Sequence, residues 1–236
     1  MTLLAAIQCA LLSFSAPSDG LQQHIQAIAT ATMAKYNCSI GIGVQTSSTA
    51  LSAAAGVQPS ARFVWGSVTK QATGATLLQL AEDGLLKLDE PVYPHLDPML
   101  DSLGLGSMTT LFGKEAELIT TEHLATMNSG VPDYDTAKPY PTPPTDTFRA
   151  EVYAKPSQEF PPASLINQSW VATGKLEFTP GEKGRRRMAY SSTNFVLLGL
   201  LIAKLRGAAD WDDFHQATLL DRLPSDRKAL YHETVR

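Results

Sequence analysis

The sequence has few cysteines, and its histidines are scattered. Only two of its 236 residues are cysteine, Cys9 and Cys38, and neither stands in a paired C-x-x-C spacing. The five histidines stand singly along the chain, without the close spacing that metal sites need. The sequence therefore predicts no metal site and no cofactor.

Positive charge is also scarce. The chain carries 19 lysine and arginine residues against 23 aspartate and glutamate residues, which gives a net charge of −4. Its one basic cluster, at residues 185–187, is typical of a solvated turn. Because nucleic-acid binding needs a basic surface, we expect no nucleic-acid partner.

Long apolar runs are missing as well. The run FVLLGLLIAKL at residues 195–205 is too short to span a bilayer and predicts a core helix. Near the start, residues 3–12 are apolar apart from Gln8, and Ser13 and Ser15 follow. This pattern is typical of a secretory signal. A buried first helix is the alternative, because the first 34 residues lack lysine and arginine.

We therefore expect residues 1–18 to be a cleaved signal peptide and the protein to be secreted. Residues 19–236 then form the mature domain, and we expect no membrane span in it. Cleavage would remove Cys9 and leave Cys38 without an intrachain partner.

The remaining pattern predicts an α+β domain. Apolar residues at helical spacing predict helices over 19–35, over 67–83 and over 193–205. Two short strand-like runs, 39–45 and 50–57, flank a polar turn and predict an antiparallel hairpin. The sequence also predicts a loop over 89–98, a short helix over 120–127, a proline-rich insertion over 136–163 that is a lid or a long loop, and a last helix over 210–223.

Ser67 and Lys70 form the motif with the clearest chemistry. They make an S-x-x-K box at the start of a predicted helix, and residues three apart lie on the same face of a helix. A serine hydroxyl becomes a good nucleophile when a base takes its proton, and a lysine that loses its own proton can be that base. The helix N-terminus favours developing negative charge on oxygen. A serine that caps a surface helix is the alternative.

Three stretches together resemble the beta-lactamase-related serine hydrolases, a group that includes class C beta-lactamases, low-molecular-weight penicillin-binding proteins, D-aminopeptidases and related esterases. The stretches are ARFVWGSVTKQATGATLLQLAEDGLLKLDEPV, ITTEHLATMNSGVPDYD and FTPGEKGRRRMAYSSTNFVLLGLLIAKLRG, in the family's order. The resemblance implies a beta-lactamase/transpeptidase-like fold, with an antiparallel sheet and a mainly helical lobe. Of that sheet, we expect only the N-terminal hairpin in this sequence.

The resemblance also implies roles for individual residues. Ser67 would be the acylated nucleophile and Lys70 its proton acceptor. Tyr190 matches the tyrosine of the family's Y-x-N box and would pass the proton to the leaving group. Ser192 takes the place of the asparagine in that box, so we expect it to contact the substrate through a shorter side chain.

Two functions follow from the resemblance. The first is a serine hydrolase that acts through an acyl-serine intermediate on an amide or ester, with a small molecule or a peptide as substrate. The alternative is an impaired or inactive member, or a fragment, that serves as a binding or scaffold protein. Ser192 suggests it, and so does the absence of the family's K-T-G or H-x-G box after Gly207. The chain would then be a fragment, a truncated gene product, or a chain whose sheet a partner molecule completes.

Overall fold

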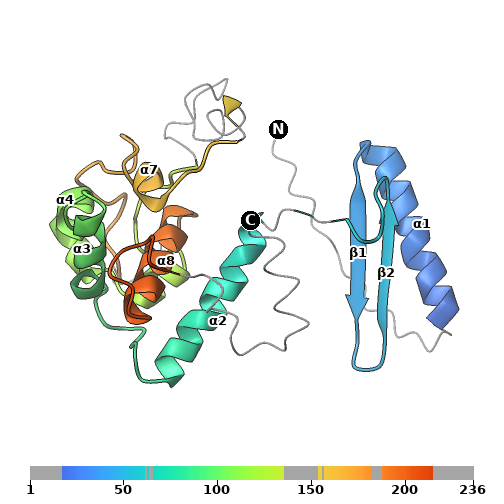
Figure 1. The fold of residues 1–236 in the computed structure, drawn as a ribbon, viewed down its shortest axis with the longest axis horizontal. Helices are drawn as coiled ribbons and strands as arrows, with labels where there is room; N and C mark the ends of the chain where they lie inside the picture. The colour runs from blue at the N-terminus through green and yellow to red at the C-terminus, as the bar shows by residue number, and fades with distance from the viewer. Residues whose placement is uncertain are drawn as a thin grey trace. The chain divides into compact units, whose positions relative to one another are not determined.

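The computed structural model describes residues 18–61, 63, 66–135, 154–155, 157–181 and 188–214. The chain falls into two compact units, drawn in Figure 1: a hairpin unit, Met1–Val64, and a helical unit, Trp65–Arg236. The predicted signal peptide lies outside the described residues apart from Ser18, so its cleavage and secretion stay predictions.

The hairpin unit is a helix packed on a two-stranded sheet. Strands β1 (Ile40–Gln45) and β2 (Ala50–Ala55) are antiparallel, with Ile40 opposite Ala55. Helix α1 (Ser18–Tyr36) lies along this hairpin in Figure 1. The predicted helix and hairpin are thus confirmed to within two residues at each end.

Small residues make the core of the hairpin unit. Side chains alternate between the two faces of a strand, so Ala53 and Ala55 point to the same face. They pack with Ile25 and Ala29 of α1, and all four side chains are buried. Alanine buries little apolar area, so this core is thin.

The helical unit is built around one buried helix, α8 (Thr193–Leu205), which packs against α2, α3, α5 and α7. Figure 1 draws α8 in orange-red among these helices. Its side chains are buried almost all round, so the predicted core helix is confirmed. The other elements are the 3-10 turn η1 (Gly66–Val68), α2 (Thr69–Glu82), α3 (Tyr93–Ser102), α4 (Met108–Phe112), the 3-10 turn η2 (Lys114–Leu118), α5 (Thr121–Ala125) and α7 (Pro162–Ile166).

The prediction of a loop over 89–98 is wrong in its second half, where α3 begins. Two prolines, Pro94 and Pro98, lie within this helix. Pro94 falls in the first turn, where a backbone N–H has no partner inside the helix in any case. Pro98 does remove a hydrogen bond, but the burial of Leu96 and its apolar neighbours offsets that cost.

Three further predictions concern the second half of the chain. The short helix over 120–127 is confirmed as α5, which Thr120 and His123 cap reciprocally. The helix over 210–223 is wrong at 210–214, which form turns, and otherwise lies outside the described residues. Most of the insertion over 136–163 also lies outside them, and its last residues begin α7.

Among the described residues, every helix is too short or too polar to cross a lipid bilayer. The same part of the chain holds no group of three or more histidine, cysteine, aspartate and glutamate side chains placed to bind a metal ion. Cys38 is an exposed free thiol.

Candidate active site

Ser67 lies on a short turn that leads into helix α2. Gly66, which starts the turn, has a φ of +52°, a left-handed conformation that glycine adopts without strain. The Thr69 hydroxyl donates to the Gly66 carbonyl at 2.8 Å and closes the turn. Ser67 is therefore exposed at the N-terminal end of α2, and Lys70 follows within the first turn of that helix.

Tyr190 comes from a segment 123 residues further along the chain and meets this turn. Its hydroxyl oxygen lies 2.7 Å from Ser67 Oγ, in a hydrogen bond that either group can donate. Lys70 Nζ donates to the same Ser67 Oγ at 3.2 Å. The structure thus brings together the three residues that the sequence singles out, and Ser67 Oγ is the atom they share.

Two aromatic rings flank the Lys70 amine. Its Nζ lies 5.2 Å from the centre of the Tyr190 ring and 5.3 Å from the centre of the Phe195 ring. The face of an aromatic ring attracts a positive charge at such distances. The two rings therefore hold the lysine side chain beside the phenol.

The Tyr190 phenol is more acidic than an ordinary tyrosine. Partial burial raises its pKa, but hydrogen bonds with Lys70, Ser67 and Ser192, together with the charge of Lys70, outweigh burial and bring the pKa below 10. The side chain is 52% exposed. Its acidity therefore depends on these few polar partners.

A second phenol close by is tuned in the opposite direction. Burial, reinforced by the negative charges of Asp135 and Asp133, raises the pKa of Tyr134 to about 12. Tyr134 therefore stays protonated over the range in which Tyr190 titrates. Of the two, Tyr190 is therefore the better suited to lose its proton and act as a base.

Ser192 lies directly before α8. Its backbone N–H donates to Asp133 Oδ1 at 2.9 Å, and its hydroxyl is one of the hydrogen-bond partners that lower the pKa of Tyr190. The structure thus gives the Ser192 side chain a partner within the site. The substrate contact that the sequence suggests for Ser192 stays a prediction.

The segment 127–134 also reaches the site, although the sequence motifs did not single it out. Met127, at one end of the segment, contacts the residues directly before and after Tyr190. Asp133, near its other end, contacts Ser192. The signal lay in the stretch MNSGVPDY, inside one of the three stretches that resemble the family. Residue spacing alone could not identify its partners, which lie about 60 positions further on.

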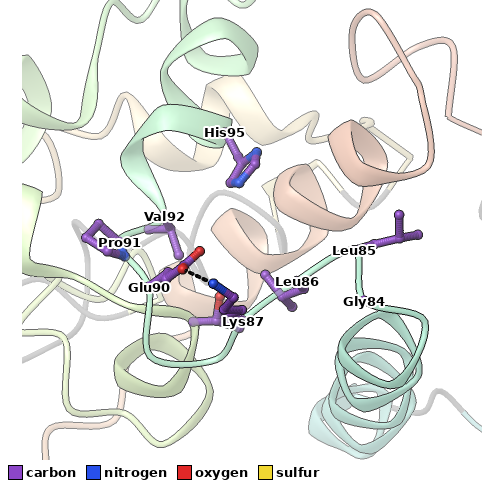
Figure 2. Close-up of a pocket in the computed structure, with 9 residues that line it drawn as sticks. Gly84, Leu85, Leu86, Lys87, Glu90, Pro91, Val92 and His95 are labelled. Atoms are coloured by element: carbon purple, nitrogen blue, oxygen red, sulfur yellow. Dashed lines mark hydrogen bonds and ion pairs between the residues drawn. The ribbon is translucent and has the colours of Figure 1, made fainter.

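The described residues of the helical unit also line several hollows, of which two are the following. One, of about 110 Å³, is lined mainly by residues 84–95. Figure 2 shows Lys87 and Glu90 at this cavity, paired through Nζ and Oε1 at 2.6 Å. The other, a groove of about 760 Å³, runs beside α8 and includes Phe195, whose ring also faces Lys70. Neither includes Ser67 or Tyr190 among the residues that line it.

An S-x-x-K serine at the head of one helix meets a tyrosine that lies three residues before a buried helix, in a chain that also has a helix–hairpin unit. The fold is beta-lactamase/transpeptidase-like α+β. The sequence profile of the Beta-lactamase family matches residues 38–232. The chain belongs to the beta-lactamase family.

Several solved structures share this fold. A D-stereospecific amidohydrolase from Streptomyces sp. matches with a TM-score of 0.65 and 23% identity, over 88% of this chain and 54% of its own. The D-amino acid amidase from Ochrobactrum anthropi SV3, complexed with L-phenylalanine, matches with a TM-score of 0.60 and 17% identity, over 88% of this chain and 52% of its own.

An octameric penicillin-binding protein homologue from Pyrococcus abyssi matches with a TM-score of 0.54 and 22% identity, over 81% of this chain and 40% of its own. At these identities the likeness shows the fold alone. This chain spans about half the length of the amidohydrolase and of the amidase.

Proposed function

We propose that this protein is a serine hydrolase that cleaves an amide bond, with Ser67 as its nucleophile. The observation that carries the proposal is the pair of contacts at Ser67 Oγ, 2.7 Å to the Tyr190 hydroxyl and 3.2 Å to Lys70 Nζ. An exposed hydroxyl, an amine and an acidic phenol within hydrogen-bond reach of one another are the groups that nucleophilic catalysis by serine needs. Membership of the beta-lactamase family supports the same function.

The first step is the removal of the Ser67 proton. Because its pKa is lowered, Tyr190 forms a phenolate at a lower pH than a free tyrosine does. That oxygen is close enough to accept the Ser67 proton, and the charge of Lys70 stabilises it. The family resemblance gives the role of direct base to Lys70. The contact of Ser67 Oγ with the Tyr190 hydroxyl is shorter than its contact with Lys70 Nζ, which favours Tyr190 as the base. Lys70 then stabilises the phenolate by its positive charge.

Ser67 Oγ then forms a bond to the acyl carbon of the substrate, and the C–N bond of the amide breaks. The departing nitrogen takes the proton held by Tyr190, so a neutral amine leaves and Ser67 carries the acyl group as an ester. The N-terminal end of α2 stabilises the negative charge that develops on the acyl oxygen.

Hydrolysis of the ester repeats the sequence with water as the nucleophile. Water gives a proton to Tyr190 and forms a bond to the acyl carbon. The bond between that carbon and Ser67 Oγ breaks, and Ser67 regains a proton from Tyr190. The products are a carboxylic acid, an amine and the free enzyme, so no co-reactant besides water is required.

An amide is the proposed substrate because two structural relatives carry names that describe amide hydrolysis, a D-stereospecific amidohydrolase and a D-amino acid amidase. The experiment is to measure ammonia release from D- and L-phenylalaninamide by the purified full chain. We expect release with wild type and none with Ser67→Ala. Thr73→Ala removes a hydroxyl from α2 beyond the Ser67 turn and is the matched control, which should remain active.

A family member that binds acyl compounds without turnover is the second candidate. Ser192, in the position of the family's asparagine, favours it, because serine offers a shorter side chain and one donor. This candidate predicts a folded protein that releases no ammonia and behaves identically with Ser67→Ala. Ammonia release that disappears with Ser67→Ala excludes it.

A further inference from the structure

Packing holds Tyr190 only in part, since the residue is 52% exposed. A phenol in this situation points toward Ser67 only if the backbone on either side of it is fixed. The partners of the neighbouring residues therefore decide whether the 2.7 Å contact with Ser67 Oγ is kept.

Met127 holds the residues directly before and after Tyr190. The Ala189 N–H donates to the Met127 carbonyl at 3.1 Å, and the Ser191 N–H donates to the Met127 sulfur at 3.4 Å. Met127 itself has a φ of +60°, which is uncommon for a residue other than glycine and costs conformational energy. In this strained conformation, Met127 accepts hydrogen bonds on both sides of the phenol.

Asp133 holds the next position. Its Oδ1 accepts the Ser192 N–H at 2.9 Å and the Asp135 N–H at 3.2 Å, and its side chain is only 6% exposed. A buried carboxylate at the N-terminal end of α8 is stabilised by the helix dipole and forms a strong charge-assisted bond with the Ser192 N–H. The first residues of α8 therefore cannot move away from Asp133 without losing that bond.

Other residues of the segment 127–134 make further hydrogen bonds to the start of α8. The Thr193 hydroxyl donates to the Pro132 carbonyl at 2.7 Å and accepts the Tyr134 N–H at 2.9 Å. The buried Ser129 hydroxyl donates to Asn194 Oδ1 at 2.7 Å. Each residue from Ser191 to Asn194 is thus bonded to the segment 127–134.

We propose that Met127 and Asp133 are positioning residues, which hold the Tyr190 phenol against Ser67 by fixing the backbone on either side of it. The kinetic consequence of this inference rests on the proposed function, whereas its geometric consequence does not. Neither side chain is required to touch the substrate.

Three variants test the inference. Asp133→Ala removes the acceptor of the Ser192 N–H, and Asp133→Asn keeps an oxygen in its place. Asp97→Ala is the matched control, because Asp97 Oδ1 also accepts a backbone N–H at the start of a helix, that of Met108 in α4 at 2.8 Å. It removes the same chemistry from the same unit without contact to the Tyr190 segment.

The first measurement is the pKa of Tyr190, followed by NMR on protein labelled at the tyrosine ζ-carbon, with Tyr190→Phe to assign the signal. Wild type and Asp97→Ala should titrate below 10. Loss of a nearby carboxylate would by itself lower the pKa of the phenol. We expect the opposite in Asp133→Ala, a rise toward about 10, because the bonds to Ser67 and Lys70 are lost. Asp133→Asn should restore most of the shift.

The second measurement is the hydrolysis of the amide substrate. Asp133→Ala should lower kcat by roughly 10- to 100-fold with little change in KM, as a misplaced catalytic group does. Met127→Leu removes only the weaker sulfur acceptor and should lower kcat less. If Asp133→Ala does not fold, the same measurements on Met127→Leu test the positioning inference.

The two proposals fail in different ways. If wild type does not hydrolyse amides, the proposed function fails, and the pKa of Tyr190 still tests the positioning. If folded Asp133→Ala keeps the wild-type pKa of Tyr190 or lowers it, or if Asp97→Ala gives the same changes, the positioning inference is wrong. The same holds if wild-type Tyr190 titrates at an ordinary pKa.

Discussion

The hairpin unit and the helical unit differ most in the depth of their cores. Among the residues that the structure describes, the hairpin unit buries four apolar side chains, and three of them are alanine. The helical unit buries large side chains such as Phe112, Leu198 and Met99 completely. Because stabilisation grows with the apolar area removed from water, the helical unit is expected to be the more stable of the two.

The candidate site lies in the unit with the larger core. Ser67, Lys70 and Tyr190 all lie in the helical unit, and the helices that carry or follow them, α2 and α8, pack against each other. The contacts at Ser67 Oγ thus depend on a unit with a substantial core of its own. A change in the hairpin unit should therefore leave those contacts intact.

Tyr190→Phe gives the largest expected effect. It removes the one polar atom that the distant segment brings to Ser67 Oγ and leaves the core of the helical unit unchanged. Loss of an acid–base group lowers kcat by about 10²- to 10⁴-fold. Amide hydrolysis measures the loss. Tyr134→Phe is the control, because Tyr134 stays protonated, and a comparable loss in that variant would show that any nearby phenol matters.

The variants Leu198→Ala and Ile25→Ala test the difference in stability between the two cores. Leu198 is fully buried in the helical unit, so its truncation should cost about 2–5 kcal/mol of unfolding free energy. The three tryptophans, at positions 65, 170 and 211, all lie in the helical unit. Tryptophan fluorescence in urea should therefore shift strongly for Leu198→Ala and little for Ile25→Ala.

If these two variants behave alike, the helical unit is not stabilised independently of the hairpin unit. A fluorescence transition that moves as far with Ile25→Ala would mean that the units unfold together. A loss of hydrolysis in Ile25→Ala at a temperature where the protein stays folded would mean that the site depends on the hairpin unit.

The smallest expected effect is a change in the free energy of unfolding at alkaline pH. Tyr134 has a pKa of about 12 in the folded protein against an ordinary value of 10, so the unfolded chain releases that proton first. Its contribution to stability is complete below pH 10 and falls as the pH rises toward about 12. Urea unfolding across this range should show a slope that Tyr134→Phe removes. An unchanged slope in that variant would assign it to another group.

Tyr190 should change the stability with pH in the opposite direction. Its lowered pKa means that the folded protein releases the proton before the unfolded chain does, so stability rises with pH from that pKa to about 10. Tyr190→Phe should remove the rise.

The sequence allowed the elements of the site to be predicted where the signal is local. The spacing of Ser67 and Lys70 and the apolar run after them predict a helix with both side chains near its start, and the structure has it. The continuous apolar run at 195–205 predicts a buried helix for the same kind of reason, and α8 is that helix. Local spacing alone decides both.

Tertiary contacts account for what the sequence did not predict. Tyr190 was singled out through family resemblance, because no spacing rule joins it to a serine 123 residues away. Asp133 and Met127 carry no motif of their own, and their value lies in hydrogen bonds to distant backbone N–H groups. The sequence does not predict helix α3 because three prolines in residues 89–98 suggest a loop, while the burial of Leu96 favours the helix.

The most direct test of the central claim is covalent labelling by a fluorophosphonate, with the modified residue located by mass spectrometry of the folded protein. We predict a single adduct, on Ser67, that forms faster as the pH rises through the pKa of Tyr190 and about 100-fold more slowly in Tyr190→Phe. No adduct, an adduct on another residue, or a rate that is the same without the Tyr190 hydroxyl would contradict the account.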